Sequence, residues 1–156
     1  MSQFKHKTPI EIRFADIDAF GHVNNAKYLT FIEQARVKYF NDIVDWLYDW
    51  SKEGIILAKA EINFVKPVLF RDEITVLTRC SRLGNKSFDL QYQIMRYKDS
   101  EETLMADGIT VMVAFDYVQK KSIVLPEEWK GGLYIGCPFL TVTSALMTGM
   151  PNCVSK

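Results

Sequence analysis

The hydrophobic period of this chain changes near Gly54, and the change restricts which folds the chain can form. Before it, residues 26–48 place apolar side chains three and four positions apart, with no glycine or proline among them. This spacing predicts a helix about twice the mean length of roughly 11–12 residues. After the change, apolar and polar residues alternate, which is the period of a β-strand. The predicted strands cover 56–64, 74–80, 88–94 and 103–117.

An alternating run also precedes the helix, over residues 8–15, so the predicted order is strand, long helix and four strands. Short turns separate the last four runs and indicate an antiparallel meander, with 103–117 as its long central strand. One helix can bury one face of one twisted sheet, and this arrangement defines an α+β fold. Because a single helix cannot cover the whole sheet, we expect apolar surface to remain and to favour a homo-oligomer.

The composition excludes several classes of protein. The 156 residues suffice for one domain, and 19 Lys and Arg balance 19 Asp and Glu, whereas a nucleic-acid binder would carry an excess of basic residues. The N-terminal residues lack the apolar segment of a secretory signal, and no apolar run reaches the roughly 20 residues that a membrane span needs. We therefore expect a cytoplasmic protein without a membrane span or a nucleic-acid partner.

Charge is almost absent from the C-terminal end. From Gly131 onwards Lys156 is the only charged residue, so residues 1–130 hold 37 of the 38 charged side chains. This change of composition divides the chain into a domain over 1–130 and an uncharged extension over 131–156. We expect the extension either to cover exposed apolar surface of the oligomer or to be partly disordered.

Cysteines and histidines are too few and too scattered for a disulfide framework or a metal site. The cysteines are Cys80, Cys137 and Cys153, and the histidines are His6 and His22. We expect reduced thiols, as is usual in the cytoplasm, with no metal and no cofactor.

Polar residues concentrate in one predicted turn, between the first strand and the long helix. Residues 16–25 contain two carboxylates, Asp16 and Asp18, with one histidine, one glycine and two asparagines. The turn leads into a helix N-terminus, whose free N–H groups and positive dipole can stabilise a developing oxyanion. A carboxylate beside such donors can act as a nucleophile or a general base on a polarised carbonyl. A purely structural interpretation, in which Asp18 and Asn24 cap the helix and hold the turn, explains the same residues.

The same segment resembles the hotdog-fold acyl-CoA thioesterases of the 4-hydroxybenzoyl-CoA thioesterase type. The run D-A-F-G-H-V-N-N-A-K-Y, from Asp18 to Tyr28, carries the resemblance, which extends over about residues 7–130. It implies a long central helix wrapped by a curved antiparallel sheet of about five strands. It also implies homodimers or homotetramers with active sites between subunits. The implied reaction is hydrolysis of an acyl-CoA thioester to free acid and CoA without a metal.

The resemblance assigns roles within the turn. The family's essential aspartate corresponds to Asp18, which would attack the thioester carbonyl or activate a water; Asp16 is the less favoured carboxylate. Backbone N–H groups of Gly21, His22 and Val23 would polarise the carbonyl oxygen. The side chains of His22 and Asn25 match family positions near the site, which makes them further candidate catalytic residues.

Two other segments match positions of the family. Glu33 and Arg36 share the apolar side of the predicted helix with Leu29, so we expect their charges to be paired. Glu33 is also a candidate for supporting the catalytic group without touching substrate. Lys86 and Ser87 lie in a turn that resembles the one meeting the CoA nucleotide, where Lys86 would contact a phosphate. An exposed hairpin lysine is the structural alternative.

Two other functions are compatible with these residues. A hotdog enoyl-CoA hydratase or dehydratase would use an Asp and a His as acid and base, although Asp18 and His22 do not have the spacing of that motif. A non-catalytic protein would bind an acyl-CoA without turnover. The acyl group itself is not specified by the sequence, because it depends on the depth of a pocket formed by packing.

Overall fold

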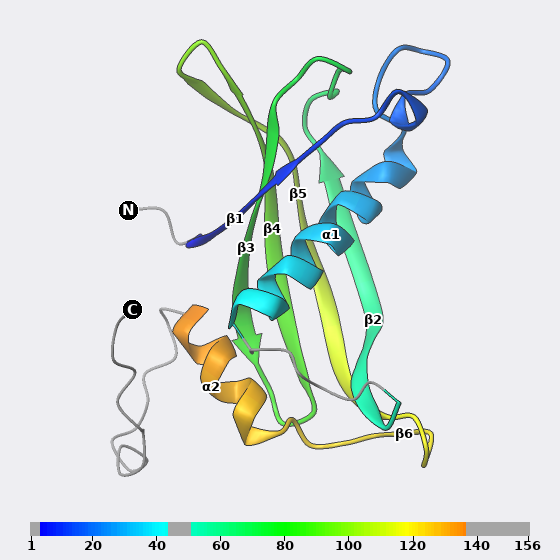
Figure 1. The fold of residues 1–156 in the computed structure, drawn as a ribbon, viewed down its shortest axis with the longest axis vertical. Coiled ribbons are helices and arrows are strands. Elements are labelled where there is room, and N and C mark those ends of the chain that lie inside the picture. The colour runs from blue at the N-terminus through cyan, green and yellow to red at the C-terminus, as the bar shows by residue number, and fades with distance from the viewer. Residues whose placement is uncertain (1–3, 44–50, 137–156) are drawn as a thin grey trace.

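A long helix lies across one face of a twisted antiparallel sheet in the computed structural model of the chain, which describes residues 4–43 and 51–136 (Figure 1). The sheet has six strands, and a second helix packs near one end of it. In chain order the elements are β1 His6–Ile10, the 3-10 turn η1 Phe14–Asp16, α1 Asn25–Ile43, β2 Glu53–Phe64, β3 Ile74–Leu83, β4 Ser87–Lys98, β5 Glu101–Asp116, β6 Lys121–Ser122 and α2 Glu127–Gly136.

The strands lie in the order β1-β3-β4-β5-β2, and the short β6 pairs with β5. The meander predicted for the last strands is confirmed for β3, β4 and β5. It is wrong for β2, which pairs with β5 at the opposite edge of the sheet instead of with β3. The connection over 65–73 is too long for a hairpin turn, so it carries the chain across the end of the sheet to β3. Alternation identifies a strand but does not identify its neighbours.

The first strand is displaced from its predicted range. It ends at Ile10, not near residue 15, and Phe14 starts the turn η1 with its side chain 83% exposed. Alternation stops because the Arg13 N–H donates to Asp16 Oδ2 at 2.9 Å, which bends the chain into the turn. Helix α1 begins one residue before its prediction; the predicted end near residue 48 lies outside the described residues.

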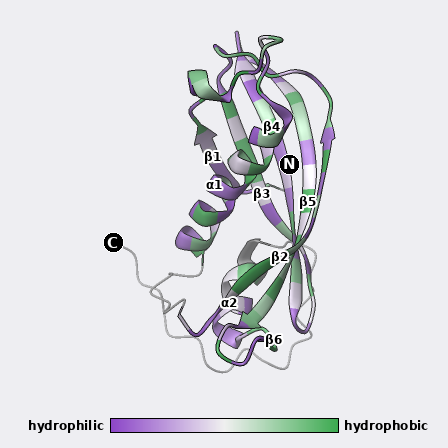
Figure 2. Cartoon of the chain, turned by 90° about the vertical axis from the view of Figure 1, so that its right-hand side faces the viewer, coloured by the Kyte–Doolittle hydropathy of each residue, from purple (hydrophilic) through white to green (hydrophobic). Residues whose placement is uncertain are grey.

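The core lies between α1 and the sheet. Leu29, predicted on the apolar side of the helix, is instead 44% exposed. Along β4, buried side chains alternate with half-buried ones, so one face of the strand is directed at the helix. Figure 2 shows the alternation as changing colour along the strands. Helix α1 buries Tyr28, Phe31, Ile32, Ala35, Tyr39 and Phe40.

Helix α2 continues through residue 130, where the composition changes. Trp129 and Leu133 are both buried in the core, and α2 packs on β3 and α1. A Cβ on Gly132 would lie 2.4 Å from the Ile43 carbonyl oxygen, so only glycine permits this close approach of the two helices. The first residues after 130 are therefore part of the domain. The remainder of the proposed extension, 137–156, lies outside the described residues.

Neither helix of the described ranges is long and apolar enough to cross a lipid bilayer.

Candidate active site

The turn between η1 and α1 is closed by its own backbone and by Asp18. Asp18 Oδ1 accepts the Phe20 N–H at 2.8 Å, and the Asp18 carbonyl accepts the Gly21 N–H at 3.0 Å. The Asp18 N–H donates to the His22 carbonyl at 2.8 Å. Gly21 adopts a φ of +81°, which an L-residue rarely adopts, so glycine is required to reverse the chain here.

The connection between β2 and β3 forms a second wall against this turn. The Val23 N–H donates to the Val68 carbonyl at 2.8 Å, and His22 forms a β-bridge with Leu69. The Val68 N–H donates to the hydroxyl of Tyr28 at 3.3 Å. Burial raises the pKa of Tyr28, so this hydroxyl stays neutral near pH 7. Two segments more than forty residues apart are thus fixed face to face.

A cavity of about 460 Å³ lies between the two segments, within the range of small-ligand pockets. It is lined by the three side chains predicted to be catalytic, Asp18, His22 and Asn25. The sequence did not point to its other wall, because residues 64–67 carry no motif. The remaining lining residues are Phe20, Val23, Tyr28, Phe64, Val65, Lys66 and Pro67.

The two oxygens of Asp18 differ in their contacts. Oδ1 accepts the Phe20 N–H and, over 3.4 Å, the His22 N–H. Among the described residues no hydrogen bond reaches Oδ2. The carboxylate is half-buried at the edge of the cavity. One oxygen therefore holds the turn while the other is available to a proton, a water or a reacting carbon.

Backbone donors near the cavity are partly used within the chain. The N–H of Gly21 bonds the Asp18 carbonyl and that of Val23 bonds the Val68 carbonyl, so neither is free for a ligand. Within the described ranges, the His22 N–H makes only its long bond to Asp18 Oδ1. At the start of α1, Asn24 Oδ1 caps the Ala26 N–H at 2.9 Å. The N–H of Asn25 has no acceptor in the described part of the chain. Asn25 and His22 thus supply the available donors.

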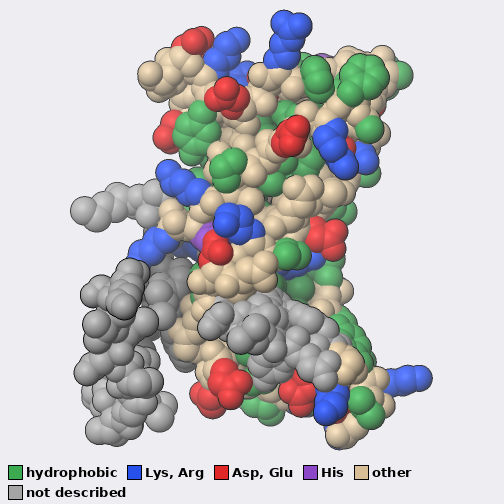
Figure 3. Space-filling view, in the orientation of Figure 1, with side chains coloured by type: hydrophobic (Ala, Val, Ile, Leu, Met, Phe, Trp, Pro, Cys, Tyr) green, Lys and Arg blue, Asp and Glu red, His purple; other side chains and the backbone are tan. Residues whose placement is uncertain are grey.

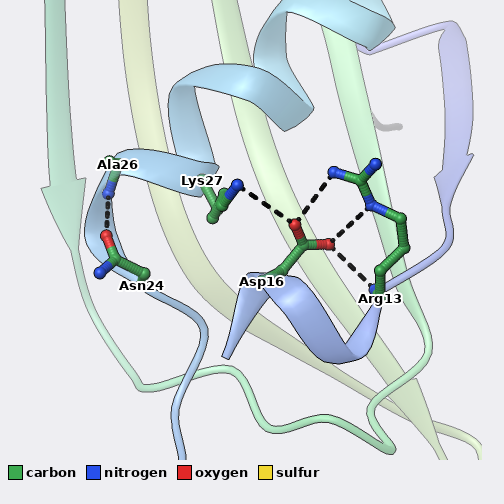
Figure 4. Close-up of polar contacts among 5 residues, drawn as sticks. All are labelled: Arg13, Asp16, Asn24, Ala26 and Lys27. Atoms are coloured by element: carbon green, nitrogen blue, oxygen red, sulfur yellow. Dashed lines mark hydrogen bonds and ion pairs between the residues drawn. The ribbon is translucent and has the colours of Figure 1, made fainter. Parts of the chain in front are cut away.

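Asp16 has very different surroundings, shown in Figure 4. Its side chain is buried, yet Arg13 and Lys27 approach it from two sides. Arg13 reaches Oδ1 at 3.1 Å and Lys27 reaches it at 3.6 Å. Burial by itself would raise the pKa of Asp16, but the hydrogen bonds from Arg13 and the two positive charges outweigh burial and lower that pKa below its ordinary value. Asp16 therefore stays ionised and does not line the cavity.

Glu33 and Arg36 form the expected pair, with 3.7 Å between Glu33 Oε1 and an Arg36 guanidinium nitrogen. The guanidinium side chain is largely buried, whereas Glu33 is largely exposed. Both line a separate cavity of about 480 Å³ beside the first half of β2. Within one chain, Glu33 does not reach the cavity of Asp18.

The hairpin between β3 and β4, which holds Lys86 and Ser87, lies at the other end of the sheet from the turn between η1 and α1 (Figure 1). Ser87 is level with Ile56 of β2, because both are paired with Val113. The cavity lies beside Phe64, eight residues further along β2, or about 26 Å at roughly 3.3 Å per residue. Lys86 Nζ donates to the Ser122 carbonyl at 3.3 Å. One chain therefore does not bring Lys86 and Asp18 together.

Other features of the described residues do not add to this site. A hollow of about 870 Å³ on the opposite face of the sheet is lined by polar side chains such as Arg79, Gln91 and Asp107. In the described ranges, no three His, Cys, Asp or Glu side chains lie together as a metal site would require. Hydrophobic side chains gather at the end of the molecule that holds the turn (Figure 3), where Phe20 and Phe64 are exposed.

Comparison with known proteins agrees on one family. A family model described as the thioesterase-like superfamily matches residues 12–133. The long-chain acyl-CoA thioesterase FadM of Escherichia coli is 28% identical over 124 residues, covering 78% of this chain and 92% of FadM. A Thermus thermophilus thioesterase solved with coenzyme A and zinc is 30% identical with a TM-score of 0.72, covering 86% and 96% of the two chains. The Pseudomonas aeruginosa protein PA5185 is 25% identical with a TM-score of 0.77, covering 86% and 93%.

Proposed function

The chain belongs to the thioesterase-like superfamily and has its hotdog fold, and we propose that it hydrolyses an acyl-CoA thioester in the cavity lined by Asp18. Relatives named acyl-CoA thioesterases support the reaction class. The observation that carries the proposal is the asymmetry of the Asp18 carboxylate. One oxygen is held by the turn, and the other has no hydrogen bond among the described residues beside a ligand-sized cavity.

The reaction needs a nucleophile, a polarised carbonyl and a protonated leaving group. As a general base, Asp18 Oδ2 takes a proton from a water whose oxygen attacks the thioester carbon. The carbon–sulfur bond then breaks, and the sulfur leaves as the thiol of CoA with that proton. As a nucleophile, Oδ2 itself attacks the carbon, the carbon–sulfur bond breaks and CoA leaves as its thiolate. Water then hydrolyses the resulting anhydride, which releases the acid and Asp18, and a proton of that water passes to the thiolate. Both routes yield the free acid and CoA, and both leave Oδ1 holding the turn.

The carbonyl oxygen gains negative charge during attack and needs donors. We assign this role to the N–H of Asn25, the first residue of α1, and to the N–H of His22 in the turn before it. The positive end of the helix dipole adds to their effect. The side chains of His22 and Asn25 line the same cavity and would orient the water or the thioester.

A second copy of the chain would complete the site. The outer edge of β2 has no partner strand among the described residues, and Leu57 and Phe64 on it are exposed. Exposed strand edges favour pairing with another chain. If two β2 edges pair in an antiparallel manner, the Lys86 end of one copy lies at the same end as Asp18 of the other. Lys86 and Ser87 would then meet the CoA of the partner's site. We therefore propose a homodimer or a larger assembly built on it.

The proposal is tested with purified protein and a panel of short, long and aromatic acyl-CoAs, with detection of the released thiol. We expect Asp18→Asn to lower kcat by about 10²- to 10⁴-fold, since it removes the base or nucleophile but keeps an oxygen to hold the turn. Asp107→Asn is the matched control, because Asp107 is a half-buried carboxylate bonded to Asn63 on the opposite face of the sheet.

Three results would contradict the proposal in different ways. Full activity of Asp18→Asn would remove Asp18 from the chemistry. Calorimetric binding of acyl-CoA by the wild type without thiol release would instead indicate a non-catalytic binding protein. Loss of the ultraviolet absorbance of an enoyl-CoA without thiol release would indicate a hydratase.

A further inference from the structure

We propose that Asp16 is a positioning residue, which holds the Asp18 carboxylate in its reactive place by fixing both ends of the turn that carries it. The inference rests on the proposed function of Asp18. Asp16 has no part in the reaction itself, because its side chain is buried and does not line the cavity. Its effect on activity is therefore transmitted through Asp18.

Asp16 contacts the incoming side of the turn with its side chain. Oδ2 accepts the backbone N–H of Arg13 at 2.9 Å and the Arg13 Nε–H at 3.4 Å. Oδ1 accepts a second guanidinium N–H at 3.1 Å. Together these bonds fix the carboxylate against the segment that arrives from β1. Hydrogen bonds between charged groups are stronger than those between neutral groups.

Asp16 also contacts the outgoing side of the turn. Its backbone carbonyl accepts the Asn24 N–H at 2.8 Å, directly before the helix. Lys27, in the first turn of α1, places its ammonium group 3.6 Å from Oδ1. The adjacent residues Ile17 and Val23 form a β-bridge. Asp16 thus joins the two backbone segments at the base of the turn, residues 16–17 and 23–24. Residues 18–22 form the loop between these segments.

The consequence for catalysis follows from geometry. Asp18 Oδ2 must lie within about 3 Å of the reacting water or carbon, and a displacement of about 1 Å can cost a factor of roughly 10² in rate. Within the loop, Asp18 is held mainly by bonds from residues of the same turn, including Phe20, Gly21 and His22. Those bonds shape the loop but do not orient it relative to α1 and Asn25. The bond from the Asn24 N–H to the Asp16 backbone carbonyl and the contact of the Asp16 side chain with Lys27 supply that orientation, and substitution of Asp16 removes the second of these.

The experiment uses full-length protein and a substrate that the wild type hydrolyses. We expect Asp16→Asn to lower kcat by about ten- to a hundredfold with KM changed less than twofold, because the cavity walls remain. Lys27→Gln, which removes one contact only, should lower kcat by a few fold at an almost unchanged melting temperature. Asp42→Asn is the control, since it breaks pairs with His6 and Lys38 at 2.9 and 3.2 Å near the other end of α1.

A cycle with Asp18→Asn separates positioning from a general loss of folded protein. If Asp16 acts through Asp18, the double variant has the residual rate of Asp18→Asn alone, within about twofold. Multiplicative effects, a kcat loss equal to the loss of folded fraction by circular dichroism, or wild-type kcat in Asp16→Asn would each overturn the inference. If Asp16→Asn does not fold, wild-type kcat in Lys27→Gln overturns it and a reduced kcat supports it. Failure of the proposed function is distinct, because it appears as full activity of Asp18→Asn.

Discussion

Two aspartates lie two residues apart at one end of α1, and their surroundings are opposite. Asp16 is 1% exposed and has both oxygens bonded or paired with cations. Asp18 is half-buried, and of its two oxygens only Oδ1 accepts hydrogen bonds within the described chain. A carboxylate held by two cations is a poor proton acceptor, whereas one with a free oxygen can take a proton. The comparison therefore separates a residue that stabilises the turn from one that can react.

The difference also explains why the reactive carboxylate depends on a neighbour. A group that keeps an oxygen free for substrate gives up contacts that would otherwise fix its position. Here Asp18 bonds mainly to backbone of its own loop, and the loop is fixed by Asp16 through Asn24 and Lys27. Function and stability are thus divided between two residues of the same type.

Alanine at each aspartate gives the largest contrast in stability. Asp16→Ala removes the bonds of the buried carboxylate to the backbone N–H and guanidinium of Arg13 and its pairing with Lys27, and we expect the free energy of unfolding to fall by about 2–3 kcal/mol. Asp18→Ala loses only bonds at the surface of a turn and should cost about 1 kcal/mol or less. Urea unfolding of both variants at pH 7 measures the difference. Equal losses would show that Asp16 is not the stabilising member of the pair.

Acid should remove the contribution of the ionised Asp16 side chain to the free energy of unfolding. Its pKa is lowered in the folded state by the Arg13 hydrogen bonds and the two cations, which outweigh burial. The corresponding stability is present above the unfolded pKa of about 3.9 and is lost as the pH falls through the lower folded value. The difference in unfolding free energy between wild type and Asp16→Asn should therefore shrink between pH 5 and pH 2. A constant difference over this range would contradict the pairing.

The sequence could predict the reactive region but not the division of roles within it. The polar segment 16–25 and the cap at Asn24 follow from residue types, because short polar side chains at a helix start have few alternatives. Asp16 and Asp18 have the same chemistry and differ only in what lies around them. The alternation of residues 8–15 predicts that Arg13 lies in a strand, and only the bend at η1 brings its guanidinium to Asp16.

The sequence also does not predict which residues far apart in the chain come into contact. The alternation of residues 56–64 identified β2, yet its pairing with β5 depends on the path of 65–73 across the sheet. That path places Phe64 and Lys66 at the cavity. No local pattern marks these residues, because their position is decided by contacts such as Val23 with Val68. The predicted role of Lys86 likewise depends on a second copy.

The loop that carries Asp18 depends on the backbone conformation of Gly21, whereas the position of the Asp16 side chain depends on ion pairs. Substitution of Gly21 by alanine tests the first of these dependences. A Cβ at Gly21 meets no atom within 4 Å, so only its φ of +81° opposes substitution. We expect Gly21→Ala to cost about 1 kcal/mol and to lower kcat. Gly131→Ala is the control, since it also meets no atom and its helical position should gain up to about 1 kcal/mol. A neutral Gly21→Ala would show that the turn can relax without strain.

The smallest expected effects come from the lysine that accompanies each carboxylate. Lys27 pairs with Asp16 and does not line the cavity, whereas Lys66 lines the cavity with Asp18. Lys66→Gln removes a cation that can meet a phosphate or polar group of CoA, so KM should rise about two- to fivefold at constant kcat, as for an exposed ion pair. Lys27→Gln should do the reverse, lowering kcat at constant KM. Steady-state kinetics over a range of salt distinguishes them, because the effect of Lys66→Gln should fade as salt screens the charge. If both substitutions changed KM alone, Lys27 would be acting on the substrate. That result would contradict the assignment of Lys27 and Asp16 to positioning and of Lys66 to substrate binding.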